Sequence, residues 1–291
     1  MTESVRAAAS DGLAAAARIS ANLGKRCAST CFVAAPASEL LQRLQEEAPG
    51  LSGCLVALDP VTLTVADIKD AKASLAAGPM RGHKEREATK STPEPSWLLV
   101  DNSAIGSFTC PAIMRGADVV IDDLSSAAEA PEGLCALSLS RDVCQDAAAR
   151  AALEQLVAQL EAPVGETPDL AGYNDLCLKR NHNAQAVVAD LTCHPAVASV
   201  RYPGLIGDPA REVALHIFEH GFGPWVRFSL AGAVEAQAAL QVASELETAG
   251  DAQVRSELFS VCDDEAALRL AVGDEDPLAI VMWLEAVLDP A

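Results

Sequence analysis

Basic residues are scarce in this chain: 21 Lys and Arg stand against 41 Asp and Glu, which gives a net charge of −20 and a pI near 4.5. Nucleic acids and anionic membrane surfaces carry negative charge themselves, so neither is an expected partner. No apolar run approaches the roughly 20 residues that a membrane-spanning helix needs, so no membrane insertion is expected. Residues 1–4 lack the basic start of a signal peptide, which favours a cytoplasmic location.

Paired cysteines, nucleotide-binding motifs and the nucleophile motif of α/β-hydrolases are missing as well. The nine cysteines are scattered singly, without a C-x-x-C pair, and most have apolar neighbours. They are interpreted as free thiols, packed as small apolar side chains in a reducing compartment.

No P-loop, G-x-G-x-x-G or G-x-S-x-G sequence occurs. With 50% apolar residues in 291, the composition is typical of a soluble globular protein with one large domain or two ordinary ones.

Two short apolar runs, at 97–100 and 119–121, organise the centre of the sequence. Apolar runs without alternation are typical of strands buried on both faces of a parallel sheet. Residues 113–115, before Gly116, are predicted to end a short crossover helix. Asp101 follows the first run at its carboxyl end, which is where open α/β sheets bind ligands. The alternative is that Asp101 is a turn residue that ends the strand.

An Asp-Asn-Ser motif at 101–103 and a Gly-Ala-Asp motif at 116–118 lie beside these runs. Their sequence and separation resemble the cystathionine γ-synthase and γ-lyase group of Cys/Met metabolism enzymes, which use pyridoxal phosphate (PLP). Three further blocks resemble that family, at 194–205, 221–230 and 268–276. The resemblance implies the α/β fold of PLP-dependent transferases (fold type I, aspartate aminotransferase-like), which usually forms dimers.

The resemblance also predicts how the chain divides into domains. Residues 1–160 are expected to form a shortened PLP-family large domain with a mostly parallel sheet. Residues 161–291 are expected to form a small C-terminal α/β domain with an antiparallel sheet, and 162–168 is interpreted as the hinge. Several tens of residues that separate two strands of the family's large domain are absent here, so this domain is expected to be truncated.

The resemblance assigns five positions to a remnant of the cofactor pocket and one to the substrate clamp. Asp101 would face the pyridine nitrogen of PLP, and Asp59 stands where the family has an asparagine that bonds the phenolic oxygen. The other pocket positions are Gly12, Leu13 and Ser125. Arg269 occupies the place of the arginine that binds the substrate α-carboxylate, for which a guanidinium fork is suited. A salt bridge to a neighbouring acid is the alternative for Arg269.

Several residues that PLP chemistry requires are missing from their positions. The family's Schiff-base lysine falls on Ser126, and no lysine occurs between Lys90 and Lys179. The ring-stacking position holds Ala34, and Asp123 stands where the family has a serine of the phosphate cup. PLP is the cofactor that the family uses, and these losses argue against its binding here.

The resemblance therefore predicts a degenerate member of this trans-sulfuration family, a pseudoenzyme that lacks catalysis. Such a protein is expected to act through association, as a homo-oligomer or as a hetero-oligomer with a full-length relative. The alternative is an active PLP-dependent carbon–sulfur lyase or transferase of Cys/Met metabolism. It would hold PLP noncovalently or use a lysine of a partner subunit.

Two further features lie outside the resemblance. Residues 216–220 spell H-x-x-E-H, which on a helix would place two histidines on one face and could bind zinc. A helix that ends before Gly221 also often carries histidines in its last turn, and no metal site is expected. Residues 78–96 hold three prolines and predict a surface loop. An alternative role for this loop, docking an acidic partner, rests on its basic residues Arg81, His83, Lys84, Arg86 and Lys90.

Overall fold

The computed structural model describes residues 14–48, 50–77, 96–125, 130, 133–160, 170–249, 255–261, 264 and 266–288. The chain divides into two compact units. The first comprises Met1–Ala57 and Ala66–Tyr173, and the second comprises Leu58–Val65 and Asn174–Ala291. The units part after Tyr173, whereas the sequence suggested a boundary after residue 160. The segment interpreted as a hinge lies outside the described residues.

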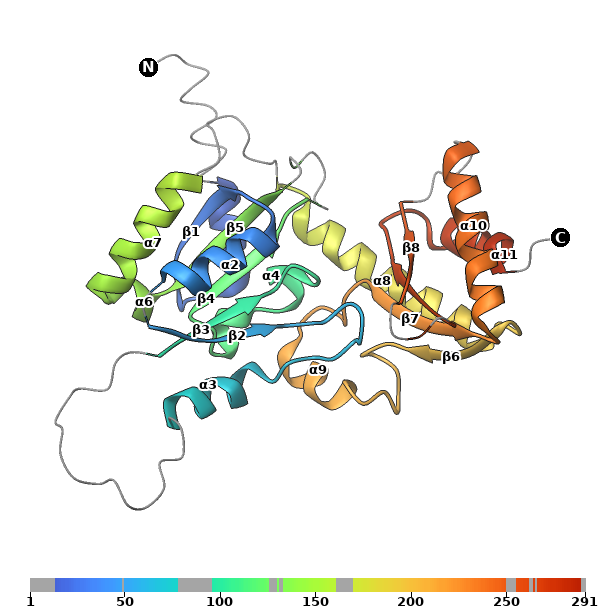
Figure 1. Ribbon diagram of the computed structural model, residues 1–291, viewed down its shortest axis with the longest axis horizontal. Coiled ribbons are helices and arrows are strands. Elements are labelled where there is room, and N and C mark those ends of the chain that lie inside the picture. Colours follow the sequence, from blue (N-terminus) through green and yellow to red (C-terminus); the bar gives the residue numbers. More distant parts are fainter. Residues whose placement is uncertain are drawn as a thin grey trace, which may run out of the picture. The chain divides into compact units, whose positions relative to one another are not determined.

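Five strands form the sheet of the first unit: β1 (Cys27–Ala34), β2 (Leu51–Val56), β3 (Trp97–Asp101), β4 (Val119–Asp123) and β5 (Leu134–Ser140). Their order is β1-β5-β4-β3-β2 (Figure 1). β3 pairs in parallel with β2 and β4, whereas β5 is antiparallel to both of its neighbours. Four strands consequently run in one direction, as the mostly parallel sheet predicted from the sequence requires.

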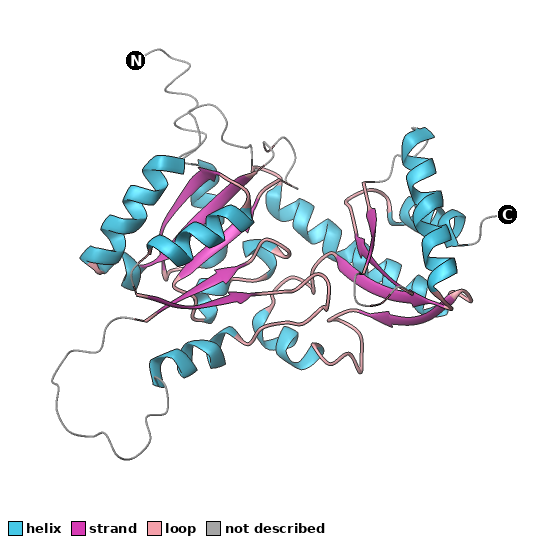
Figure 2. Ribbon diagram, viewed as in Figure 1, coloured by secondary structure: helices cyan, strands magenta, loops and turns pink. Residues whose placement is uncertain are grey.

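Helices cover both faces of this sheet (Figure 2). On one face, α2 (Ala37–Glu47) and α7 (Ala147–Leu160) pack their leucines against Leu99 of β3 and Ile121 of β4. Each fully buried leucine or isoleucine stabilises the fold by about 2 kcal/mol, so the two apolar runs read from the sequence anchor the core. The other face is covered by α3 (Ile68–Ala77), α4 (Gly106–Thr109) and α5 (Ala112–Arg115), while α6 (Arg141–Gln145) follows β5 directly.

A buried ion pair fixes α3 to the start of β4. Lys72 Nζ contacts Asp118 Oδ2 at 2.5 Å, and the side chain of Asp118 is 1% exposed. The same oxygen accepts the backbone N–H of Leu98 at 2.8 Å, and Lys72 Nζ also lies 5.6 Å from the ring centre of Trp97. Gly116 permits this arrangement, because its φ of 121° ends α5 and turns the chain into β4.

A second sheet, of four strands, forms the centre of the second unit. It comprises β6 (Val197–Arg201), β7 (Trp225–Leu230), β8 (Glu257–Ser260) and β9 (Ala267–Ala271), in the order β6-β7-β9-β8. Every pair is antiparallel, as predicted. The helices of this unit are α8 (Tyr173–Cys193, from Asn174 onward), α9 (Arg211–Ile217), α10 (Ala233–Ala249) and α11 (Pro277–Leu288).

The two faces of this second sheet differ in polarity. Val226 and Phe228 of β7 and Leu268 and Leu270 of β9 pack against α8, α10 and α11 in one core. Because side chains alternate along a strand, the residues between them point to the opposite face, which carries charged side chains. None of the described helices is long and apolar enough to span a bilayer.

Candidate functional site

Asp101 lies where the parallel strands of the first unit reach their carboxyl ends. Its side chain is half-buried, and Oδ1 accepts the backbone N–H of Ser103 at 3.0 Å. Its carbonyl oxygen accepts the N–H of Ala57 at 2.8 Å. Asp101 therefore occupies the strand end that both interpretations of the sequence predicted, and one of its carboxylate oxygens closes a local turn.

The carboxylates at this end of the sheet affect two thiols, Cys135 and Cys54. Burial raises the pKa of the Cys135 thiol to about 12, and the charges of Asp123, Asp122 and Asp101 add to the shift. Burial also raises the pKa of Cys54, to which Asp101 contributes further. Both thiols are therefore protonated at neutral pH and are poor nucleophiles. The acids give the strand ends a negative electrostatic potential, which favours cations over anions.

Ser125, which the resemblance placed in the phosphate cup, follows β4. Its backbone N–H donates to Oδ1 of Asp123 at 2.8 Å. A cup for a phosphate dianion needs free backbone N–H groups and no adjacent negative charge, and this amide is already bound to a carboxylate. Gly12, Leu13 and Ser126 lie outside the described residues. The part of the cup that the structure describes does not fit the phosphate of PLP.

Asp59 and Arg269, the other two predicted site residues, belong to the second unit. Asp59 Oδ1 accepts the N–H of Val61 at 2.8 Å, and Oδ2 accepts the hydroxyl of Thr62 at 2.7 Å. Burial opposes ionisation of Asp59, but these hydrogen bonds and the charge of Arg269 outweigh it, so its pKa lies below the usual value. Both carboxylate oxygens of Asp59 thus hold a tight turn, and Arg269 lies within electrostatic range of that carboxylate.

Arg269 is held by aromatic rings. Its guanidinium carbon lies 4.8 Å from the ring centre of Phe259 and 5.5 Å from that of Trp225. Such cation–π contacts each contribute about 0.5–1 kcal/mol where water is present and more where it is excluded. Its Nε is buried and has no hydrogen-bond partner among the described residues. Among the described residues Arg269 makes no salt bridge; its guanidinium stacks on the two rings and lies within electrostatic range of Asp59.

A row of arginines crosses the charged face of this sheet. Arg201 on β6 pairs in register with Arg227 on β7, and Arg227 pairs with Arg269 on β9. Carboxylates neutralise the first two: Arg201 Nε lies 2.7 Å from Asp208, and Arg227 lies 3.4 Å from Asp264. Only the register of three strands brings these residues together, so the sequence pattern gave no sign of the row.

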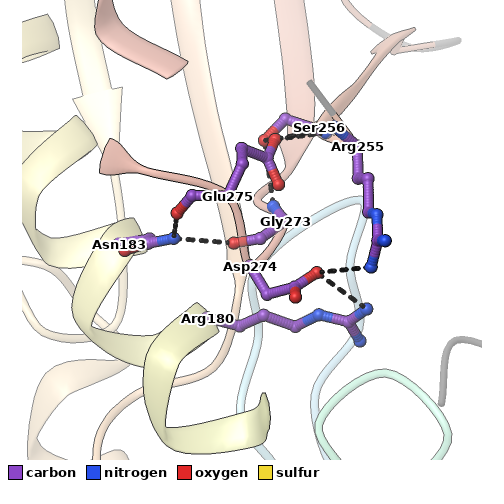
Figure 3. Close-up of polar contacts among 7 residues, drawn as sticks. All are labelled: Arg180, Asn183, Arg255, Ser256, Gly273, Asp274 and Glu275. Carbon is purple, nitrogen blue, oxygen red and sulfur yellow. Dashed lines mark hydrogen bonds and ion pairs between the residues drawn. The ribbon is translucent and has the colours of Figure 1, made fainter. Parts of the chain in front are cut away.

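The loop after β9 is fixed by polar contacts that start from Asp274 (Figure 3). Its Oδ1 lies 4.0 Å from Arg180 on α8 and 3.4 Å from Arg255. Asn183, one turn along α8 from Arg180, donates from Nδ2 to the carbonyl oxygens of Gly273 at 3.0 Å and Glu275 at 2.8 Å. This helix therefore holds the loop that leaves the strand bearing Arg269.

Glu275 secures the other side of the same loop (Figure 3). Its Oε1 accepts the backbone N–H groups of Arg255 and Ser256, both at 2.8 Å, and the Ser256 hydroxyl at 2.7 Å. Ser256 Oγ in turn accepts the N–H of Gly273 at 2.9 Å. The network fixes residues 255–256 to the end of β9.

The H-x-x-E-H sequence does not lie on one helix. α9 ends at Ile217, and His220 has a φ of 60°, a left-handed backbone conformation. His216 and His220 are therefore not displayed one turn apart on a helical face, as a zinc site of this type requires. No group of three or more metal-ligating side chains occurs in the described part of the chain.

Asn102 and Asp122 form a buried pair that the sequence did not single out. Both side chains are fully buried, and Asn102 Nδ2 donates to Asp122 Oδ1 at 2.9 Å. The only signal in the sequence is that Asp122 directly follows the apolar run of β4, where a polar residue would be expected to reach solvent. The pair supports the turn that follows Asp101.

The matches to known proteins come from the comparison with solved structures. No family model and no curated protein matches this chain. A protein assigned as an O-acetylhomoserine (thiol)-lyase from Campylobacter jejuni, solved with N′-pyridoxyl-lysine-5′-monophosphate, matches with a TM-score of 0.73. The identity is 13%, and the match covers 94% of this chain and 84% of that one. Cystathionine γ-synthase from Xanthomonas oryzae, in complex with aminoacrylate and cysteine, matches with a TM-score of 0.68, 15% identity and the same two coverages.

This chain has the fold of the PLP-dependent fold type I enzymes. The match supports the resemblance to trans-sulfuration enzymes predicted from the sequence, and at these identities it establishes the fold. Two local features of this chain differ from what a PLP site requires. At the position predicted for the phosphate cup, the carboxylate of Asp123 accepts the backbone N–H of Ser125, and both carboxylate oxygens of Asp59 accept hydrogen bonds within a turn. The described residues therefore do not fit PLP.

Proposed function

We propose that this chain is a non-catalytic protein with a trans-sulfuration enzyme fold, which acts by association rather than by turnover. The observation that carries the proposal is the absence of any lysine between Lys90 and Lys179, with Ser126 at the lysine position. A serine hydroxyl cannot form the nitrogen link to the aldehyde of the cofactor, nor can it shuttle protons as an amine does.

The local geometry of the predicted site residues supports this proposal. Asp123 brings negative charge to the position expected for the PLP phosphate, and its carboxylate binds the N–H of Ser125. Arg269 stacks on Trp225 and Phe259, so its charge is stabilised without a substrate carboxylate. We regard Gly12, Leu13 and Ser125 as the remnant of a cup that no longer binds phosphate.

Association with another subunit is the proposed route by which the protein acts. The partner is a second copy of the chain or a full-length relative of the same fold, because a disarmed subunit can still complete or regulate an assembly. We propose a cytoplasmic location, where unpaired cysteines such as Cys54 and Cys135 remain reduced.

An active PLP-dependent carbon–sulfur lyase or transferase is the second candidate. It is favoured by the two residues of the family site that this chain retains. Asp101 stands at the carboxyl end of β3, and Arg269 keeps its place in β9. In this candidate PLP would be held noncovalently, or a lysine would come from a partner subunit.

Two measurements separate the candidates. The purified protein, without added PLP, is reduced with borohydride and measured by intact-mass spectrometry; we expect the mass to remain that of the polypeptide. Release of keto acid from cystathionine with added PLP should not exceed the rate given by free PLP. A stable pyridoxyl adduct, or turnover above that control that is lost in both Asp101→Asn and Arg269→Ala, would establish the enzyme instead.

A further inference from the structure

Asn102 and Asp122 join the ends of two neighbouring strands inside the first unit. Asp122 belongs to β4, and Asn102 follows the last residue of β3. Both side chains have 0% exposure. Asn102 Nδ2 donates one hydrogen to Asp122 Oδ1 at 2.9 Å and the other to the carbonyl oxygen of Cys110 at 3.1 Å. Both amide hydrogens of Asn102 are therefore used.

The other oxygen of each side chain lacks a donor. Asn102 Oδ1 and Asp122 Oδ2 are buried, and neither accepts a hydrogen bond from the residues that the structure describes. The ion pairs of the described residues do not include Asp122. An ionised carboxylate without a cation or a full set of donors is unfavourable in such a position.

A proton on Asp122 supplies the missing donor. A carboxylic acid and a primary amide can form two hydrogen bonds side by side. The amide N–H donates to one acid oxygen, and the acid O–H donates to the amide oxygen. The first bond is present, and the two atoms of the second are the two oxygens without a donor. We propose that Asn102 and Asp122 form a buried proton-binding site in which Asp122 Oδ2 holds the proton and donates it to Asn102 Oδ1.

The electrostatic surroundings support a resident proton. Burial raises the pKa of Asp122 to about 7; the hydrogen bond from Asn102 and the backbone N–H of Ser107 on α4 oppose the shift, and the charge of Asp101 on β3 adds to it. From β5, the thiol of Cys135 faces the same acids, and its own pKa of about 12 keeps it neutral. Asp122 is therefore the group of this cluster that changes charge near neutral pH.

The proton is expected to stabilise the turn that carries the chain away from Asp101. The backbone N–H of Asn102 donates to the carbonyl oxygen of Ile121 at 2.8 Å, and its own carbonyl oxygen accepts the N–H groups of Ile105 and Gly106. Without the proton, Asp122 Oδ2 and Asn102 Oδ1 would both be acceptors and would repel each other. Ionised Asp122 would also add its negative charge to that of Asp101. The end of the sheet is thus expected to loosen as pH rises, whether or not any cofactor binds.

The sign of the pH dependence follows from linkage. The pKa of Asp122 in the folded protein lies above the unfolded value near 3.8, so the folded state binds more protons between these two values. Stability is then highest at the acidic end of this interval and falls as pH rises from about 4 to about 7, with little further change above.

Asp122→Asn tests the proposal, because a second amide can make both hydrogen bonds and cannot titrate. Thermal unfolding is measured from about pH 5 to about pH 8.5, above the range in which ordinary Asp and Glu titrate. We expect the wild-type Tm to fall by several degrees relative to Asp122→Asn across this range. Asp70→Asn, at an exposed position of α3, should keep the wild-type slope. Parallel curves for wild type and Asp122→Asn would overturn the proposal.

A direct measurement on the wild-type protein does not depend on the variant folding. With ¹³C-labelled aspartate, the side-chain carboxyl carbons are followed by NMR as a function of pH. We expect one aspartate to titrate near pH 7, with the chemical shift of a protonated acid below that pH. If every aspartate carboxyl has already ionised by about pH 5, Asp122 carries no proton and the site does not exist.

Discussion

Arg227 lies directly opposite Arg269 across β7 and β9, so two guanidinium groups are cross-strand neighbours on one face of the small sheet. Like charges in this relationship destabilise a sheet. The structure compensates for each in a different way. Arg227 pairs with Asp264 and donates to the carbonyl oxygen of Val61, whereas Arg269 stacks on two aromatic rings. The stability of this face therefore depends on the shape of the Arg269 side chain as well as on its charge.

Arg269→Lys should lower the free energy of unfolding by about 1 kcal/mol, because a lysine ammonium cannot lie flat against both Trp225 and Phe259. The measurement is urea-induced unfolding followed by circular dichroism. Arg255→Lys is the matched control, since the Arg255 side chain is 71% exposed and should tolerate the change. If the two variants have the same free energy of unfolding, the stacking of Arg269 on Trp225 and Phe259 does not stabilise the protein.

Lys72→Met should destabilise the first unit strongly, by about 3 kcal/mol, because it leaves the buried carboxylate of Asp118 without its cation. The residual hydrogen bond from Leu98 keeps the loss at the lower end of the usual range. Lys69→Met, at an exposed position on the same helix, makes the same chemical change without a buried partner. Unfolding of both variants in urea gives the comparison, and a difference below about 1 kcal/mol would contradict the prediction.

Cys135 should resist alkylation in the native protein. Its thiol is fully buried and has a pKa of about 12, so almost no thiolate is present at neutral pH. Cys193 is exposed and should react before Cys135. Iodoacetamide labelling followed by peptide mass spectrometry gives the order of reaction, with urea-unfolded protein as the control in which both react. Rapid native labelling of Cys135 would show that the end of the sheet opens readily.

Asp59 should stabilise the second unit in a pH-dependent way. Its pKa in the folded protein is lower than in the unfolded chain, so its contribution is present above the unfolded value near 3.8 and is lost as pH falls through the lower folded value. The difference in Tm between the wild type and Asp59→Asn is expected to be positive at about pH 6 and to shrink towards about pH 3. A difference that does not change with pH would mean that the charge of Asp59 has no role in the turn.

The sequence predicted the parts of the fold that depend on local patterns. The apolar runs of β3 and β4 each end at acids, Asp101 and Asp122, and this ending marks where each strand leaves the core. Gly116 was assigned correctly to the end of a helix because its left-handed conformation is one that few other residues adopt. The antiparallel pairing of β7 and β9 also followed from the blocks that resemble the family.

Contacts between distant segments could not be predicted from the sequence. The pairing of Asn102 with Asp122 depends on how β3 and β4 align, and the row from Arg201 to Arg269 depends on two registers at once. The helix expected to continue to His220 was wrong for a local reason: α9 ends at Ile217, before the helical spacing of the two histidines is complete. Histidine spacing alone does not reveal where a helix stops.

The eight residues Leu58–Val65 have a consequence for modular engineering of this protein. They belong to the second unit although the chain on both sides of them, at Ala57 and Ala66, belongs to the first. The backbone therefore passes between the units three times, and Leu58 and Leu63 are fully buried. A fragment cut after Tyr173 would carry these leucines without the rest of their unit. A chimera that transfers the second unit to another protein must therefore include Leu58–Val65 as well as the residues from Asn174 onward. The two units cannot be exchanged at a single junction.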